Sequence, residues 1–204
     1  AALAIKGYFP MEELKTLNKP GTRLPSHCDR NLTVGIDMTT GSLGQGASTA
    51  AGIALGNRLS GRDSKTYLIL GDGEIQEGQV WEMASFAAHR KLDNLIAFVD
   101  NNKKQLDGYT KDINDPRDIR AKFESFGWYA QDADGKCVAS IYEAIERARN
   151  TKGKPSVIVL DTIKGQGCSF AENLLFNHHI EISESQMKEA IEELEKKLEK
   201  VVSL

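Results

Sequence analysis

The stretch G-D-G-E-I-Q-E-G at residues 71–78, together with D-N-N at residues 100–102, decides the fold of this chain. Each motif follows directly on a short apolar run that is typical of a buried strand, residues 67–70 in one case and 95–99 in the other. In an open parallel sheet, ligands bind in the crevice beyond the carboxyl ends of neighbouring strands. We therefore expect both motifs at one edge of a sheet, facing the same crevice.

The side chains at these strand ends suit a magnesium ion. Asp72 supplies an anionic oxygen, Asn102 a neutral amide oxygen, and the backbone carbonyl of Lys104 a third ligand. Magnesium takes oxygen ligands in near-octahedral geometry and usually keeps waters and substrate phosphates in its remaining positions. The sequence therefore predicts a metal that carries a diphosphate.

The glycines around Asp72 suit the diphosphate itself. Gly71 and Gly73 let the backbone turn sharply and approach a phosphate without a Cβ atom in the way. A helix that opens near Gln76 would point its free N–H groups at the anion. The alternative is an ordinary strand-to-helix turn with polar residues, which G-D-G alone does not exclude. The matching D-N-N at a second strand end favours the binding site.

Five motifs follow one another along the chain: L-P-S-H (24–27), T-T-G-S-L-G-Q-G (39–46), G-D-G-E-I-Q-E-G-Q-V-W-E (71–82), D-N-N-K-K-Q-L-D-G (100–108) and T-I-K-G-Q-G (162–167). In this order they resemble the thiamine diphosphate enzymes of the transketolase type, whose cofactor signature begins with G-D-G and ends with N-N. The resemblance covers most of the chain except its carboxyl-terminal helix. It implies thiamine diphosphate and Mg²⁺, or Ca²⁺ or Mn²⁺ in its place, as cofactors.

The resemblance also assigns cofactor-binding residues. Gly41 and Leu43 are implied to contact the cofactor, although both could instead cap and pack a helix of small residues. Their glycine-rich string is not a dinucleotide fingerprint, because the preceding residues 34–40 are a polar, glycine-broken approach and not a strand. The full implied set is Gly41, Leu43, Gly71, Asp72, Gly73, Glu74, Asn102, Lys104 and His178, with Asp72, Asn102 and Lys104 on the metal.

Two histidines are candidate catalytic residues. His27 lies in L-P-S-H, where the family carries a histidine that contacts the sugar, and His178 lies where the family carries one near the diphosphate and the substrate. An imidazole there could donate to a phosphate oxygen or move a proton near neutral pH. The family has Pro where this chain has Cys28, and Gly where it has His179, which makes His179 the alternative to His178. His89 fits an ordinary position inside a helix.

Glu77 and Glu82 are spaced so that both can lie near the amino-terminal end of one helix, where the helix dipole favours negative charge. Stabilising that helix end is one interpretation. The resemblance implies another, in which both glutamates belong to a chain of carboxylates that crosses the interface between two cofactor sites. Carboxylates that close would share protons and titrate as coupled groups.

Chain length and net charge limit the classes of function that this protein can have. The 204 residues are enough for one α/β domain with a sizeable core. A net charge of −3 offers no broad attraction to nucleic acid or anionic lipid, so local groups and a metal must hold an anionic cofactor. Cys28, Cys137 and Cys168 are widely spaced and odd in number, and we expect reduced thiols. With neither a membrane-spanning run nor a signal peptide in the sequence, the expected location is the cytoplasm.

Strand-like and helix-like runs alternate along the chain, which predicts an α/β fold with an open, mostly parallel sheet and helices on both faces. Residues 1–182 are expected to form the diphosphate-binding domain and residues 183–204 a carboxyl-terminal helix. An irregular segment is expected before residue 40, a long loop from residue 100 to about 115, and a glycine-rich loop up to His178. The expected strands are 67–70, 95–99, 128–131 and 156–161, and the expected helices are 43–59, 80–92, 116–126 and 138–150.

The terminal segment is predicted to be an amphipathic helix. Ser183 and Gln186 can form a capping box at its start. Its apolar stripe packs either on its own domain or on a partner chain, while the Glu and Lys face is expected to be solvated. The stripe consists of Met187, Ile191, Leu194, Leu198 and Val201.

Part of the family's machinery has no counterpart in this sequence. Transketolase-type enzymes need a second domain that holds the pyrimidine ring of the cofactor and supplies an activating glutamate, and this chain has room only for the diphosphate-binding domain. The chain also opens in what looks like the middle of a helix, residues 1–5, and lacks the family's upstream G-H-P and G-H-A motifs. We therefore expect the amino-terminal part of the domain to be missing.

The resemblance implies the diphosphate-binding subunit of a split transketolase, an enzyme of the pentose phosphate pathway that moves a two-carbon ketol unit from a ketose phosphate to an aldose phosphate. The implied partner is a pyrimidine-domain subunit in a two-fold heterotetramer, with neither nucleic acid nor membrane as a partner. Alternatives in chemistry are dihydroxyacetone synthase, 1-deoxyxylulose 5-phosphate synthase and a 2-oxo acid dehydrogenase component. A non-catalytic binding subunit is the alternative from another class.

Overall fold

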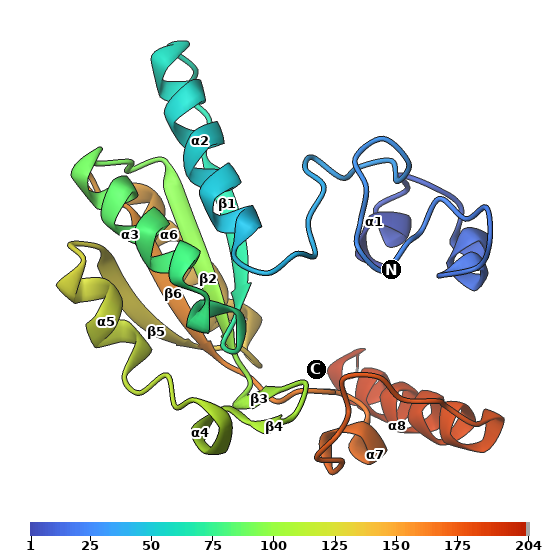
Figure 1. The fold of residues 1–204 in the computed structure, drawn as a ribbon. Coiled ribbons are helices and arrows are strands. Elements are labelled where there is room, and N and C mark those ends of the chain that lie inside the picture. Colours follow the sequence, from blue (N-terminus) through green and yellow to red (C-terminus); the bar gives the residue numbers. More distant parts are fainter. Residues whose placement is uncertain (203–204) are drawn as a thin grey trace.

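A four-stranded parallel sheet lies at the centre of the computed structural model, which describes residues 1–202 and their side chains up to residue 199. The strands are β1 (Thr66–Gly71), β2 (Leu95–Asn101), β5 (Tyr129–Asp134) and β6 (Ser156–Asp161). Their order across the sheet is β1-β2-β6-β5 (Figure 1). The inner strands β2 and β6 are covered on both faces, and this explains their continuous apolar runs.

Helices cover both faces of the sheet, as the sequence predicts. Three helices, α2 (Gln45–Leu59), α3 (Gly78–His89) and α5 (Ile119–Ser125), share one apolar cluster with side chains from all four strands. On the opposite face, α6 (Val138–Asn150) packs its buried alanines against β2, β5 and β6 (Figure 1). The buried residues of α2 are all alanines, which lets this helix approach α3 and β1 closely.

Aromatic side chains join α3 to α5. The Trp81 and Phe123 ring centroids lie 5.1 Å apart, and those of Phe123 and Trp128 lie 5.2 Å apart. The indole N–H of Trp128 donates to the Ala84 carbonyl at 2.9 Å, which satisfies its one polar group inside the core. This cluster fixes α3 against the sheet and so fixes the position of its first turn beside the end of β1.

Several short elements lie beyond the carboxyl ends of the strands (Figure 1). The 3₁₀-helix η2 (Glu74–Gln76) joins β1 to α3. A small antiparallel hairpin of β3 (Lys104–Gln105) and β4 (Gly108–Tyr109) follows β2 and leads into α4 (Thr110–Ile113). After β6 the chain forms α7 (Ser169–Glu172). These segments surround the edge at which the sequence predicts ligand binding.

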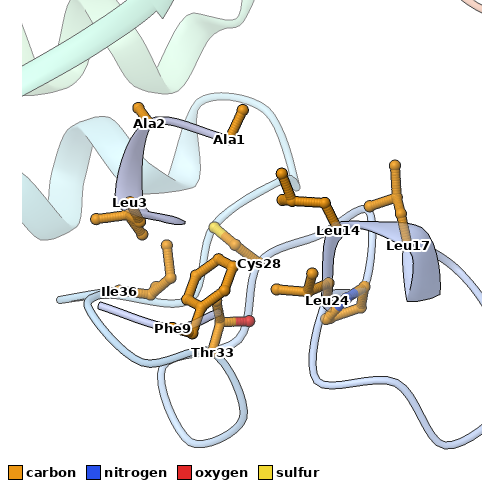
Figure 2. Close-up of a pocket in the computed structure, with 11 residues that line it drawn as sticks. Ala1, Ala2, Leu3, Phe9, Leu14, Leu17, Leu24, Cys28, Thr33 and Ile36 are labelled. Carbon is orange, nitrogen blue, oxygen red and sulfur yellow. The ribbon is translucent and has the colours of Figure 1, made fainter. Parts of the chain in front are cut away.

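The amino-terminal segment stands to one side of the sheet (Figure 1). It contains α1 (Ala2–Ile5) and the 3₁₀-helix η1 (Met11–Thr16), and it has its own small apolar cluster. Figure 2 shows a pocket of about 460 Å³ in this segment, lined mainly by apolar side chains such as Phe9 and Leu24. All residues that line it lie before residue 37, so it is separate from the strand ends.

The element bounds differ from the sequence prediction where local geometry overrides periodicity. Helix α2 begins at Gln45 and not at residue 43, because Gly44 before it adopts a left-handed conformation with φ 80°. The long loop expected up to residue 115 contains the β3–β4 hairpin and α4. Helix α5 begins only after Asp118, whose side chain accepts from the Ala121 N–H at 2.8 Å. Helix α3 spans 78–89 and not 80–92, and β5 spans 129–134 and not 128–131.

The terminal helix α8 (Glu184–Val202) begins with the predicted capping box. Ser183 Oγ accepts from the Gln186 N–H at 3.3 Å, and Gln186 Oε1 accepts from the Ser183 N–H at 3.0 Å. The interpretation that the apolar stripe packs on its own domain is wrong for most of the described helix. The stripe side chains there are 46–61% exposed, namely those of Met187, Ile191, Leu194 and Leu198. The Val201 side chain lies outside the described residues. Among the helices that the structure describes, none is both long enough and apolar enough to cross a membrane.

Candidate functional site

The register of β1 on β2 brings the two predicted motifs together. Gly71 is paired with Asp100, so Asp72 directly follows the end of β1 beside the end of β2. The Asp72 N–H donates to the Asp100 carbonyl at 3.2 Å, and Asp72 Oδ2 accepts from the Lys103 N–H at 2.5 Å. The prediction that both motifs meet at one edge of the sheet is therefore confirmed.

Asp72 is 1% exposed and carries an unusual titration behaviour. Burial raises the pKa of its carboxyl from 3.8 to about 6, although the N–H groups of Lys103 and Gly73 oppose that rise. The nearby Asp100 raises this pKa further, and the Lys164 ammonium lowers it. A buried carboxylate in such surroundings is stabilised by a cation, which is the role that a divalent metal would fill.

Asn102 and Asp100 link the ends of three strands. Asn102 Nδ2 donates to Asp100 at 3.2 Å, and its Oδ1 accepts from the Lys104 N–H at 3.0 Å. The Thr162 hydroxyl, just beyond β6, donates to the other oxygen of Asp100. Within residues 1–202, no three His, Cys, Asp or Glu side chains gather as a metal-binding group. The predicted ligand set has only one such side chain, Asp72, and its amide and backbone oxygens are the hard ligands that Mg²⁺ accepts.

The two glycines of G-D-G have different surroundings. A Cβ atom on Gly73 would lie 2.9 Å from the Gln105 Cβ, so the hairpin packs directly against this glycine. A Cβ on Gly71 would meet no protein atom closer than 3.8 Å. No contact within the described chain therefore requires glycine at position 71, and the approach of a diphosphate to this glycine stays a prediction.

Glu74 connects the end of β1 to the start of α2. Its Oε1 accepts from the Gly44 N–H at 3.0 Å, and its Oε2 accepts from the Gly71 N–H at 3.1 Å. The carboxylate therefore holds the glycine-rich loop that contains Gly41 and Leu43 against the strand end. Leu43 itself is 55% exposed.

His27 lies over Gly41. A Cβ on Gly41 would be 2.4 Å from the His27 Cγ, and Gly41 has φ 131°, a conformation that side chains other than glycine rarely adopt. The structure thus brings together two residues that the sequence assigned separately, one to the sugar and one to the cofactor.

His178 is joined by Lys164, a residue that the sequence analysis missed. Lys164 Nζ donates to His178 Nδ1 at 2.9 Å. Lys164 is half-buried, and burial lowers the pKa of its ammonium group while the charges of Asp72 and Asp100 oppose that change. Burial, followed by the Lys164 charge, lowers the pKa of His178. The only sequence signal for Lys164 was its place in T-I-K-G-Q-G.

Glu77 and Glu82 lie at the start of α3 and are both exposed. No backbone N–H of α3, which lies wholly in the described part of the chain, donates to the Glu77 side chain. Direct capping by Glu77 is therefore not observed, and the interface role of the two glutamates stays a prediction.

Comparison with known proteins identifies the family. The model of the family described as "Transketolase, thiamine diphosphate binding domain" matches residues 1–200. The chain belongs to this family. The expected α/β fold, the thiamine diphosphate-binding domain and membership of the transketolase type of transferases are thereby confirmed. The roles of single residues and the divalent metal stay predictions.

Individual members of the transketolase family are similar to this chain over most of its length. It is 55% identical to the 6-deoxy-6-sulfo-D-fructose transketolase subunit SqwG of Clostridium sp. (strain MSTE9), over 96% of this chain and 71% of that protein. It is 40% identical to an apulose-4-phosphate transketolase subunit of Actinobacillus succinogenes, over 94% of this chain and 69% of that protein. The crystal structure of transketolase from Campylobacter jejuni superposes with a TM-score of 0.83 at 29% identity, over 89% of this chain but only 29% of that chain.

Proposed function

We propose that this chain is the diphosphate-binding subunit of a two-chain transketolase, which transfers a two-carbon ketol unit from a ketose to an aldose. The observation that carries the proposal is the meeting of Asp72 and Asn102 at adjacent strand ends, with the Lys164 ammonium close enough to influence Asp72. The relatives from Clostridium and Actinobacillus are themselves called transketolase subunits, which supports a partner subunit.

The residues at the strand ends would hold the cofactor and its metal. Asp72, Asn102 and the Lys104 carbonyl would bind Mg²⁺, and the backbone at Gly71 would approach the diphosphate. When bound, thiamine diphosphate supplies a nucleophilic carbon that carries the two-carbon unit between sugars. The part of this chain in the chemistry is to orient the diphosphate and to hold protons near the reacting sugar.

In the proposal, two histidines hold protons near the reacting sugar. The His178 pKa is lowered by burial and by Lys164, so its imidazole is neutral near physiological pH and its other ring nitrogen can exchange a proton or donate to a phosphate oxygen. His27, which lies over Gly41, would contact the sugar from the opposite loop. His178 and His179 are both exposed, but in the described chain Lys164 contacts His178 and not His179, so we assign the role to His178.

The partner subunit would hold the pyrimidine ring and supply the glutamate that activates it, with Glu77 and Glu82 near the interface. The sugar substrates would carry an anionic group at the end remote from the transferred carbons. A ketose phosphate is one candidate, and the 55% identical relative, named for a sulfonated fructose, makes a sulfonated ketose the other. We place the assembly, two copies of each chain, in the cytoplasm.

Calorimetric titration with thiamine diphosphate and Mg²⁺ tests the proposal. Asp72→Ala and Asn102→Ala should each abolish magnesium-dependent binding without changing the circular dichroism spectrum of the chain. Asp112→Ala is the matched control, because Asp112 is an exposed carboxylate on the nearby helix α4. Cofactor affinity equal to that of the unmodified chain in either site variant would refute the assignment of the metal site.

A further inference from the structure

The side chain of Lys104 reaches out of the hairpin into the segment that carries His178. Lys104 Nζ donates to the Glu172 carbonyl at 3.1 Å and to the Leu174 carbonyl at 2.8 Å. These carbonyls lie at and just beyond the end of α7, where a helix leaves its last carbonyl groups without partners inside the helix. Lys104 is 9% exposed although it is a lysine, so the ammonium group is held at these two acceptors.

The segment that Lys104 contacts, residues 163–178, is braced within itself. Asn177 Nδ2 donates to the Lys164 carbonyl at 3.0 Å and to the Ala171 carbonyl at 2.8 Å. The Gly167 N–H donates to Glu172 Oε1 at 2.8 Å. These bonds tie the two ends of the segment together, so we expect a contact at Glu172 and Leu174 to influence the position of Lys164 as well.

We propose that Lys104 is a positioning residue whose ammonium group anchors segment 163–178 to the β3–β4 hairpin, so that Lys164 and His178 face the diphosphate. This role belongs to the side chain and is separate from the predicted role of the Lys104 carbonyl on the metal. One residue would thus connect the metal to the opposite wall of the site. The proposal rests on the proposed function for the identity of the ligand, but not for the anchoring contact.

Hydrogen exchange of the cofactor-free chain tests the anchor by itself. Lys104→Met removes both charge-assisted hydrogen bonds and keeps the apolar part of the side chain, so amides in residues 165–177 should exchange about tenfold faster or more. Amides in β2 and α3 should keep their exchange rates. Lys111→Met is the matched control, because Lys111 Nζ and Lys104 Nζ both lie 5.9 Å from the Tyr109 ring centroid, whereas Lys111 is exposed on α4. Unchanged exchange in 165–177, or a uniform rise across all elements, would overturn the anchor.

Kinetics of the complex with the pyrimidine-domain subunit test the consequence for the site. Lys104→Met should raise the KM for thiamine diphosphate by about tenfold, the loss expected for one charge-assisted hydrogen bond, and should leave the KM for the sugar unchanged. Faster exchange in 165–177 with an unchanged KM for the cofactor would show that the contact is structural only and would overturn the positioning role. If the unmodified chain binds no thiamine diphosphate, the proposed function fails while the exchange result still decides the anchor.

Discussion

Replacing Asp72 by Asn removes a buried charge and nearly preserves side-chain size, so it should change how stability depends on pH. Burial raises the pKa of Asp72 from 3.8 to about 6 in the folded, metal-free chain. The folded state therefore binds this proton more tightly than the unfolded state does. The destabilisation of the folded chain by this carboxylate is absent below about pH 3, where the carboxyl is protonated in both states, grows between about pH 3 and 6, and is nearly complete above about pH 7.

The magnitude follows from the two pKa values. Their difference, about 6 against 3.8, at 1.36 kcal/mol for each pKa unit corresponds to about 3 kcal/mol. The free energy of unfolding of Asp72→Asn, relative to the unmodified chain, should therefore rise by about 3 kcal/mol between about pH 3 and about pH 7.5. Any altered hydrogen bond to the Lys103 N–H gives a nearly constant offset, which this comparison between two pH values removes.

Urea unfolding of both chains in the presence of a metal chelator measures this difference. Trp81 and Trp128 lie in the aromatic cluster, so their fluorescence reports on unfolding of the core. Curves of unfolding free energy against pH that run parallel for the two chains would show that Asp72 titrates as an ordinary carboxyl. At pH 7.5, added Mg²⁺ with thiamine diphosphate should stabilise the unmodified chain and leave Asp72→Asn unaffected.

Two further outcomes are expected in the assembled enzyme and in the isolated chain. His27→Ala should raise the ketose KM or lower turnover with cofactor affinity nearly unchanged. Gly41→Ala should also impair the sugar kinetics, because its Cβ would lie 2.4 Å from the imidazole, and it should weaken cofactor binding as well, because Gly41 is itself a predicted cofactor contact. Steady-state kinetics with calorimetry check both variants, and a loss of cofactor affinity without a sugar defect from His27→Ala would move His27 to the other site. The purified chain alone should show no ketol transfer until a pyrimidine-domain chain is added; turnover by a preparation that mass spectrometry shows to be free of any second polypeptide would contradict the two-chain proposal.

Sequence reasoning succeeded where one physical signal dominated. Helix α6 and strand β6 have the predicted bounds, since an alanine-bearing amphipathic run and a continuous apolar run are bounded there by polar and proline-containing residues. The meeting of Asp72 with D-N-N was also predictable, because parallel strands place their carboxyl ends at one edge. The β3–β4 hairpin was missed, since strands of two residues have no periodicity to detect.

The contacts that sequence reasoning did not predict join distant parts of the chain. Lys104 was chosen for its carbonyl, and nothing local shows that its side chain bonds to residues 68 and 70 positions later. The sequence shows Lys164 only as one residue of the T-I-K-G-Q-G motif. Its position beside His178 and near Asp72 is seen only in the folded structure. Glu74 was predicted to bind the cofactor, and that role stays a prediction; its carboxylate also accepts from the N–H groups of Gly44 and Gly71, a contact that its place in the motif did not reveal. Such roles depend on tertiary pairing and not on spacing.

The strand order also governs how the chain is made. During translation, β1 and β2 emerge with α2 and α3 and can pair at once, whereas β5 appears before its partner exists, because in the described sheet β5 pairs only with β6. Strand β6 is synthesised last and must insert between β2 and β5. Until residue 161 has left the ribosome, the nascent chain holds an open β2 edge and an unpaired strand, which are the surfaces that cause aggregation during synthesis. Ribosomal stalling before β6 is thus more hazardous for this protein than stalling after it.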